Sequence, residues 1–443
     1  MNSLQRKITY RLYPNAEQTL RLESALGLHQ RLYNTALEER IRIYQTEKRS
    51  ISFAEQCRDL TRWRKSVPAL GAINAQAEQV TLKRIDLAFQ AFFRRCKSGE
   101  TPGFPRYKSI ERFRGWGYKD HGNGWKLIPG PNDGAHGWIT MQEAGGRIPI
   151  RGRSRLPGIP KTCEILHRSG RWYASVTLNV EASGIHREAG TGLAAFDWGV
   201  KTFLTIAAED GTLTPVDNPR HLRRQLEAVR QLGRTITRKR RAAQAASGKT
   251  TGFPVSASLR RAYAQLARLY GKVARQRADF LHQTSSWLVK TFGALGTEQL
   301  NVASMVQSPA PGGKRRRGLH REILSTSPSA FLQQVRYKAE EAGTGLEEAP
   351  TRKLKPTQRC HACGVLPKEK KLLSDSRHAC PHCGAQAGRD DNAALVLLHW
   401  LKLSLKFTGQ ELAEVLSGVR HWDGSPNAAA IQHETLAICA YAL

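Results

Sequence analysis

The sequence predicts an α+β protein of several domains, and three observations support this prediction. Apolar side chains recur at helical spacing from residue 14 to about residue 98. Residues 108 to about 185 are instead rich in glycines, aromatic side chains and short alternating runs, as in a small β-barrel. Two cysteine pairs between residues 360 and 383 have the spacing of a zinc ribbon. A chain of 443 residues is long enough for two to four such domains.

Local signals predict the amino-terminal elements in order. Residues 5–13 alternate polar and apolar side chains, which predicts a strand. Pro14 ends this strand and opens a helix, and Ser52 with Glu55 forms a capping box for a second helix. A third helix is expected over about residues 75–96.

The barrel-like stretch follows a basic turn at residues 99–108. Its clearest strand is residues 171–180, where apolar and polar side chains alternate. Five aromatic residues of this half of the chain could stack on nucleic-acid bases or belong to the core: Tyr13, Phe104, Tyr107, Trp116 and Tyr118. Residues 181–191 are interpreted as a linker.

The carboxyl-terminal half begins with a strand, a tight turn at Gly199 and a second strand within residues 193–207. Long basic helices are expected at residues 219–246 and 256–292, and residues 308–318 are expected to form a flexible basic loop. Shorter helices are expected at residues 331–342 and 392–406. The last 35 or so residues carry no recognisable motif.

The charge balance is extreme, because 69 Lys and Arg face 37 Asp and Glu and give a formal net charge of +32. Basic residues occur along the whole chain, which favours a long polyanion, most simply nucleic acid, as the partner. The two basic helices could be solvated faces, but at this net charge we interpret many of their side chains as phosphate contacts.

No apolar stretch approaches the ~20 residues that span a bilayer, and the first residues lack the apolar run of a signal peptide. We therefore expect no membrane partner and a cytoplasmic, nucleoid-associated protein. Four scattered cysteines also suit a reducing compartment better than a disulfide framework: Cys57, Cys96, Cys163 and Cys439.

The paired cysteines predict one structural zinc ion. Its ligands are Cys360, Cys363, Cys380 and Cys383, two C-x2-C pairs separated by residues 364–379. Four sulfurs complete a tetrahedral site and leave no open position for catalysis. His361 and His382 are therefore interpreted as bystanders rather than ligands.

Three acidic residues stand at the ends of apolar segments rather than in charged runs. Asp197 ends a strand, Glu298 follows an apolar stretch, and Asp390 precedes a helix. Taken singly, each is more typical of a turn residue or a helix cap. Taken together, with a basic helical insertion and a zinc ribbon, they predict a nuclease site in which carboxylates hold two Mg²⁺ ions roughly 4 Å apart.

These residues lie in motifs that resemble those of TnpB, a family of transposon-encoded RNA-guided DNA nucleases related to compact type V CRISPR effectors. Phe196–Lys201, Gly296–Leu300 and Arg389–Ala394 resemble the first, second and third RuvC motifs, with the ribbon between the second and third. The resemblance covers about residues 5–400. It includes four further motifs: Arg11–Asn15, Gly103–Arg106, Arg277–His282 and Tyr337–Ala339.

The resemblance implies an RNase H-like RuvC nuclease domain with an inserted zinc ribbon, and a helical recognition lobe inserted in a small wedge β-barrel. It implies the catalytic acids Asp197, Glu298 and Asp390, and the partners are a guide RNA and double-stranded target DNA with a short flanking motif. The implied domains are the wedge (residues 1–13 and 108–188), the helical lobe (14–107), the nuclease domain (189–358 and 387–406), the ribbon (359–386) and a tail of unknown role (407–443).

Two residues depart from the family pattern. Gly388 stands where an acid usually opens the third motif, so Asp391 is a competing candidate for the role of Asp390. Trp198 is bulkier than the usual residue after the first acid and is expected to narrow the site. Neither change removes a predicted ligand, so an active nuclease is expected.

Two other functions remain open. One is a nuclease-inactive RNA-guided repressor, although such lineages typically lose acids that this chain retains. The other is a DNA transposase, which the same chemistry could support without RNA. The guide RNA could be encoded at a transposon end or in a CRISPR array, and the polypeptide alone does not distinguish these two sources. It also does not give the flanking motif or the oligomeric state.

Overall fold

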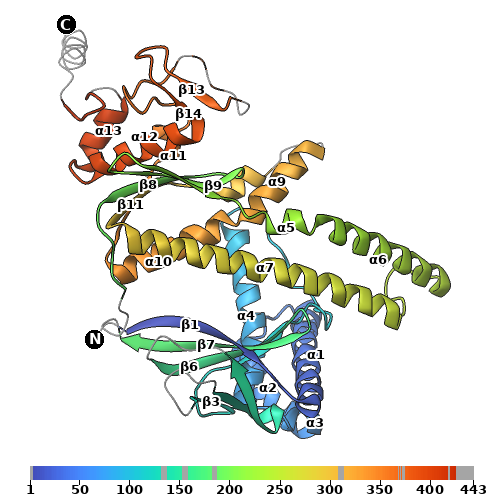
Figure 1. The fold of residues 1–443 in the computed structure, drawn as a ribbon. Coiled ribbons are helices and arrows are strands. Elements are labelled where there is room, and N and C mark those ends of the chain that lie inside the picture. Colours follow the sequence, from blue (N-terminus) through green and yellow to red (C-terminus); the bar gives the residue numbers. More distant parts are fainter. Residues whose placement is uncertain are drawn as a thin grey trace. The chain divides into compact units, whose positions relative to one another are not determined.

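The computed structural model in Figure 1 describes residues 3–130, 137–151, 158–181, 187–307, 314–367, 369, 371, 375–417 and 420–425. The chain divides into two compact units, Met1–Ile185 and His186–Leu443. No described helix is long and apolar enough to cross a membrane.

Four helices of the first unit form its helical part: α1 (Ala16–Glu47), α2 (Phe53–Ser66), α3 (Pro68–Gly71) and α4 (Ala75–Lys97). The predicted capping box is present, because the Ser52 side chain accepts from Glu55 N while the Glu55 side chain accepts from Ser52 N. Asn15 and Gln18 make a second capping box at the start of α1. The three longer helices therefore begin close to where the sequence predicts them.

The β part of the first unit is one antiparallel, nearly closed, barrel-like sheet. Its order is β2-β6-β7-β1-β5-β4-β3. The strands are β1 (Ser3–Leu12), β2 (Gly115–Tyr118), β3 (Trp125–Ile128), β4 (Trp138–Met141), β5 (Gly146–Arg151), β6 (Ile159–Arg168) and β7 (Arg171–Glu181), with a 3-10 turn η1 at Gln142–Ala144. Strand β1 pairs with both β7 and β5, so all four helices lie in the chain between two strands of one sheet.

Helices and barrel share one hydrophobic core. Leu82 and Ile85 of α4 belong to the same buried cluster as Trp116 of β2 and Ile165 of β6. His29 of α1 stacks on Trp116 with ring centroids 5.3 Å apart. The two parts are thus packed as a single body, although the sequence pattern separates them.

The second unit is built on a mixed five-stranded sheet of order β10-β9-β8-β11-β12. The strands are β8 (Leu193–Trp198), β9 (Thr202–Ala208), β10 (Leu213–Asp217), β11 (Ala294–Glu298) and β12 (Gly345–Ala349). Strands β8, β9 and β10 are antiparallel neighbours, whereas β11 runs parallel to β8 and β12.

Helices cover both faces of this sheet, as Figure 1 shows. On one face, Phe196 of β8 and Leu295 of β11 pack with helices α7 (Ala257–Thr291) and α10 (Pro328–Ala342). On the other face, Ala195 of β8 packs with α12 (Arg389–Ser404). Alternate residues of β8 thus enter two different cores, as the pleat of a strand requires.

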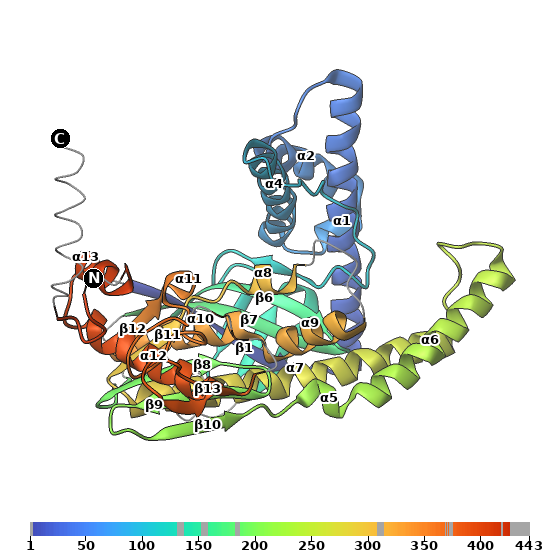
Figure 2. The ribbon, with the colours of Figure 1, turned by 90° about the horizontal axis from the view of Figure 1, so that it is seen from above.

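The remaining elements surround this sandwich: α5 (His221–Arg224), α6 (Leu226–Ser247), α8 (Val302–Val306), α9 (Lys314–Thr326), α11 (Thr351–Leu354), β13 (Arg377–Ala379), β14 (Gln386–Gly388) and α13 (Gly409–Ser417). Helices α6 and α7 form the two-helix hairpin seen in Figure 2, with a small core of Ile236, Leu259 and Ala262.

The expected flexible loop at residues 308–318 is partly wrong. Helix α9 already begins at Lys314, because Lys and Arg are good helix formers and the prolines of this stretch lie before it. Residues 308–313 lie outside the described residues.

Candidate functional sites

Strand pairing brings Asp197 and Glu298 to the same edge of the sheet. Ala195 of β8 is paired with Gly296 of the parallel strand β11. Two residues further along this register, Asp197 faces the position of Glu298, at the carboxyl end of each strand. Because side chains alternate along a strand, both acids lie on the face that α12 covers.

Helix α12 brings the third acid. Asp390 stands in its first turn, and the helix packs against the same face of β8 and β11. Gly296 permits this close approach, since a Cβ there would lie 3.0 Å from Leu401 Cβ and 3.3 Å from the Leu397 carbonyl oxygen of α12. A larger residue would push α12, and with it Asp390, away from the sheet.

The charges of Glu298 and Asp390 both act on Asp197. Burial, then the negative charges of Glu298 and Asp390, hold the pKa of Asp197 well above its usual range, while Arg389 opposes this shift. Burial also raises the pKa of Glu298, against a hydrogen bond with Thr351. Arg389 Nη2 lies 3.1 Å from Asp390 Oδ1 and orients that carboxylate.

This donor set fits a hard divalent cation. Among the described residues, no hydrogen-bond donor accounts for the buried Asp197 carboxylate, and only neighbouring charge and burial act on it. A buried carboxylate without a donor, next to two further carboxylates, is stabilised by a bound cation that prefers oxygen ligands. Within the described part of the chain, the compact group of His, Cys, Asp or Glu that could hold one ion is the four cysteines, and the three acids do not form such a group.

The structure gives the surroundings of Trp198 and Gly388, the two residues that depart from the family motif. Trp198 packs into the core on the α7 and α10 face, opposite Asp197, so it does not narrow the site as expected. The Asp391 side chain folds back over Gly388, where it leaves no room for a Cβ. Of the two adjacent acids, it is Asp390 whose charge acts on Asp197.

The four cysteines form the second candidate metal centre. The sulfurs of Cys360, Cys363, Cys380 and Cys383 all lie within 4.8 Å of one another. The two pairs are built alike: Gly364 N donates to the Cys360 carbonyl and Gly384 N to the Cys380 carbonyl, each at 3.0 Å. Both glycines have a left-handed backbone, with φ of 70° and 74°. The cluster has the composition and compactness of a structural zinc site.

Asn392 joins the first cysteine pair to α12, a role that sequence reasoning missed. Its buried side chain accepts from His361 N at 3.1 Å and lies 3.0 Å from His361 Nδ1. It also donates to the carbonyls of Arg359 at 2.8 Å and Pro356 at 3.2 Å. His361 is therefore no bystander, although it remains outside the four sulfurs. In the sequence, the one signal for the role of Asn392 in joining the knuckle to α12 was its position two residues after Asp390.

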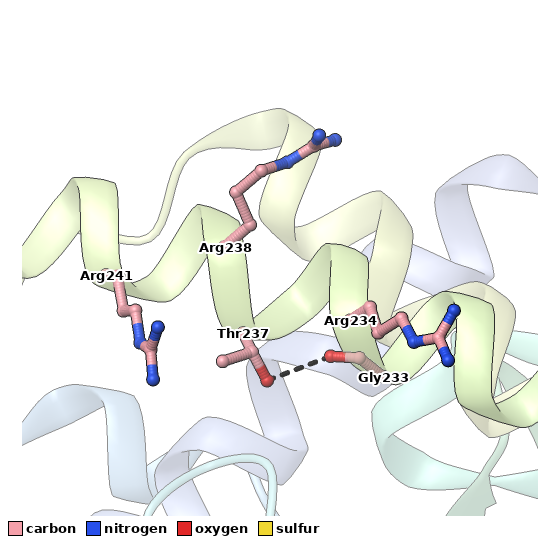
Figure 3. A pocket seen from close by; sticks show the side chains of 5 residues that line it. All are labelled: Gly233, Arg234, Thr237, Arg238 and Arg241. Carbon is pink, nitrogen blue, oxygen red and sulfur yellow. Dashed lines mark hydrogen bonds between the residues drawn. The ribbon is translucent and has the colours of Figure 1, made fainter.

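The α6–α7 hairpin is strongly basic. Residues 226–291 contain fourteen Lys and Arg but only two acids. Figure 3 shows Arg234, Arg238 and Arg241 on successive turns of α6 around an open pocket. Such a run of exposed arginines is the electrostatic footprint of a nucleic-acid backbone.

A second basic groove of about 470 Å³ lies between α5, α7 and α9. Its basic lining is Arg277, Arg317, His320 and Arg321, and Tyr270 adds a half-exposed ring. Arg277 Nη1 donates to the Ser325 carbonyl at 3.3 Å and so connects α7 with α9. Cations around an aromatic ring suit a phosphate with its attached base.

The structure also sorts the five aromatic candidates of the first unit. Trp116 and Tyr118 are fully buried in the core, so they cannot stack on bases. Phe104 and Tyr107 are about half exposed. Tyr13 is flanked by the guanidinium groups of Arg11 and Arg151, at 4.5 and 4.7 Å from its ring centre.

Comparisons with known proteins agree with the sequence motifs. A family model described as "Probable transposase" matches residues 175–309, one described as "Cas12f1-like, TNB domain" matches 329–397, and a "Helix-turn-helix domain" model matches 1–49. Two relatives are named "Putative RNA-guided DNA endonuclease". One, from Streptomyces pristinaespiralis, is 27% identical over 90% of both chains. The other, InsQ of Escherichia coli K12, is 25% identical over 88% of this chain and 90% of its own.

A solved structure resembles the fold. The Cas12f1 chain in a Cas12f1–sgRNA–target DNA complex matches with a TM-score of 0.52 at 13% identity, over 90% of this chain and 99% of that chain. That likeness concerns the fold alone. The resemblance to TnpB that the sequence motifs indicated is confirmed by the family models and the two relatives.

Proposed function

We propose that this chain, a relative of TnpB, is an RNA-guided DNA endonuclease that cuts its target with a single RuvC site. The observation that carries the proposal is the convergence of Asp197, Glu298 and Asp390, from two parallel strands and one helix, on one face of a sheet. The names of the relatives from Streptomyces and Escherichia support the same activity.

We assign Asp197, Glu298 and Asp390 as the residues that would hold two Mg²⁺ ions. When bound, such ions supply an activated water and stabilise the leaving 3′ oxygen. The protein's own contribution is to hold three carboxylates in place before substrate arrives, with Arg389 fixing Asp390.

The domain assignment is part of the proposal. The sandwich of residues 189–358 and 387–406 would be the RNase H-like nuclease domain, and residues 359–386 the ribbon with one zinc. The barrel strands within residues 1–13 and 108–188 would form the wedge, split by the lobe at 14–107. Strand β1 pairing with β5 and β7 supports that split.

Guide RNA and target DNA would be held mainly through phosphates. The α6–α7 hairpin and the groove at Arg317 and Arg321 supply cations without base-reading geometry. This agrees with a mechanism in which base pairing reads the sequence while the protein reads backbone and a flanking motif. Binding should therefore weaken steeply as salt rises.

One alternative has an observation in its favour. The family model over residues 175–309 carries the description "Probable transposase", so a DNA transposase that acts without RNA is the second candidate. A nuclease-inactive repressor is less favoured, because all three acids are present and the charges of Glu298 and Asp390 both act on Asp197.

The test is to express the protein with its native flanking DNA and sequence the RNA that co-purifies. One abundant RNA ending in a variable segment, which directs cutting of matching DNA, is the expected result. Its constant part would identify the source as a transposon end or a CRISPR array. Random RNA, together with footprints of RNA-free protein on transposon ends, would replace the proposal with the transposase.

A further inference from the structure

The segment after α13 turns back onto the zinc site and is firmly held there. Arg420 Nε donates to Glu414 Oε2 of α13 at 2.7 Å, and Arg420 Nη1 donates to the Gly424 carbonyl at 3.2 Å. His421 N donates to the Ser425 carbonyl at 2.8 Å. These bonds close a compact turn, residues 420–425, at whose centre Trp422 lies.

Trp422 contacts α12 and the first cysteine pair at the same time. Its ring stacks on His399 of α12, with centroids 4.5 Å apart and planes 15° from parallel. Its Nε1 donates to the His361 carbonyl, between Cys360 and Cys363, at 3.2 Å. It also packs on Gly364, where a side chain would collide with the indole.

Arg359 gives an independent reason for an aromatic ring at this place. This residue precedes Cys360, is only 5% exposed, and donates to the carbonyls of Leu354 at 3.0 Å and Gly364 at 2.7 Å. Its Nη2 is buried without a hydrogen-bond partner among the described residues. The guanidinium carbon lies 5.1 Å from the Trp422 ring centre, so the ring face supplies the missing stabilisation as a cation–π contact.

The knuckle that Trp422 covers is also the one bonded to the start of α12. His361 bonds to Asn392, and Asn392 stands two residues after Asp390. Trp422 therefore closes a ring of contacts that runs from His399 through the knuckle and Asn392 back to α12. A shift of the knuckle would be transmitted to the first turn of that helix, where Asp390 lies.

We propose that Trp422 is a positioning residue, and that residues 420–425 complete the zinc module. The turn holds the first knuckle on α12, which slows loss of zinc and keeps Asp390 in register with Asp197. The zinc part of this proposal stands on the cysteine cluster alone, whereas the Asp390 part rests on the proposed nuclease function.

The experiment compares full-length wild type with Trp422→Ala, Trp422→Phe and a matched control, Trp287→Ala. Trp287 is a 41% exposed indole on α7 that contacts the Phe292 ring. Zinc transfer to the chromogenic chelator 4-(2-pyridylazo)resorcinol is followed by absorbance. Trp422→Ala should release zinc at least ~10-fold faster, as changes around metal ligands typically do. Trp422→Phe should stay closer to wild type, because it retains the ring that faces His399 and Arg359, and Trp287→Ala should match wild type.

Zinc release in Trp422→Ala at the wild-type rate would overturn the proposal. If that variant does not fold, judged by its circular dichroism, Trp422→Leu decides in its place, because leucine keeps apolar volume but loses the ring that faces His399 and Arg359. Wild-type zinc release from Trp422→Leu would equally overturn the proposal. Cleavage at equal zinc content is the second readout. A fall in kcat with unchanged KM supports the link to Asp390. Faster zinc release with unchanged kcat would contradict the link between Trp422 and Asp390 but support the role of Trp422 in zinc retention. If the wild type does not cut DNA, the rate of zinc release alone tests the proposal.

Discussion

The two candidate metal centres share the neighbourhood of α12 but are assembled in opposite ways. The zinc site takes its four sulfurs from one stretch, residues 360–383, in two knuckles with the same backbone hydrogen bonds. The acid site takes Asp197, Glu298 and Asp390 from two strands and a helix that only the folded sheet brings together. The zinc site follows from the spacing of cysteines in the sequence, whereas the acid site follows from how the strands and α12 are arranged in the fold.

The difference has an energetic side. Thiolate ligands at a closed site bind the ion strongly, so that metal binding contributes to folding itself. The carboxylates instead repel one another, and burial, Glu298 and Asp390 raise the pKa of Asp197. The fold is thus made to tolerate an unfavourable cluster, which is common where a site serves function rather than stability. Four predictions follow this contrast, from the largest effect to the smallest.

The largest effect is expected for Asp197→Asn. The change keeps the shape but removes the charge of the central ligand, so DNA cleavage should fall by about 10³-fold or more. Guide-dependent target binding, measured by a mobility shift, should remain within about threefold because no phosphate contact is lost. Cleavage at the wild-type rate would remove Asp197 from the site.

Asp390→Asn and Asp391→Asn make a matched pair of adjacent changes. Asp390 acts on Asp197, whereas Asp391 folds over Gly388 at the helix start. Asp390→Asn should reduce the single-turnover cleavage rate by at least ~10²-fold, and Asp391→Asn by less than ~10-fold. The reverse order would show that topology places Asp391 in the site.

Most of what could be predicted from the sequence depended on neighbouring residues. The cysteine ligands, the Ser52 and Glu55 capping box, and the strand–turn–strand at Gly199 are local patterns. The three acids could be named because each ends an apolar segment, but their meeting depended on the family resemblance. Their mutual approach requires the parallel pairing of β8 with β11, which no local pattern shows.

What could not be predicted are contacts between distant segments. The face of the sheet on which Trp198 lies cannot be predicted until the strand register is known. The roles of Asn392 and Trp422 depend on side chains that meet across about 30 to 60 residues. The shared core of helices and barrel likewise depends on β1 pairing with strands that follow all four helices. Propensity and spacing carry no information on such pairs.

Removal of zinc should disrupt the structure of the ribbon, whereas removal of magnesium should not. Cys380→Ser should lose stoichiometric zinc, and residues 355–388 should become sensitive to limited proteolysis, because the small ribbon has little core of its own. Cys57→Ser, outside the cluster, is the control and should retain zinc. Dialysis into magnesium-free buffer should leave the ribbon protected. A protected ribbon in zinc-free Cys380→Ser would mean that the metal is not structural.

The smallest expected effect concerns the stability of the magnesium-free protein with zinc retained, where replacing Asp197 should stabilise the fold rather than destabilise it. The pKa of Asp197 is raised in the folded state, so the folded protein binds the proton more tightly than the unfolded chain. This contribution is fully present below the ordinary pKa of Asp, near 4, and is lost as pH rises towards the folded-state value. At neutral pH, Asp197→Asn should therefore be more stable than wild type by about 1–2 kcal/mol, as changes that relieve a strained site often are.

The advantage of Asp197→Asn should shrink as the pH is lowered towards 4, because the folded wild-type carboxyl is then protonated and the unfolded chain only begins to bind the proton. Adding Mg²⁺ should raise the melting temperature of wild type and much less that of the variant, because binding to the folded state alone stabilises it. Thermal unfolding at pH 4.5 and 7.5, with and without Mg²⁺, measures both effects. A variant less stable than wild type at pH 7.5 without Mg²⁺ would show that Asp197 contributes to stability like an ordinary buried polar residue. The contrast between a stabilising and a destabilising metal centre would then be lost.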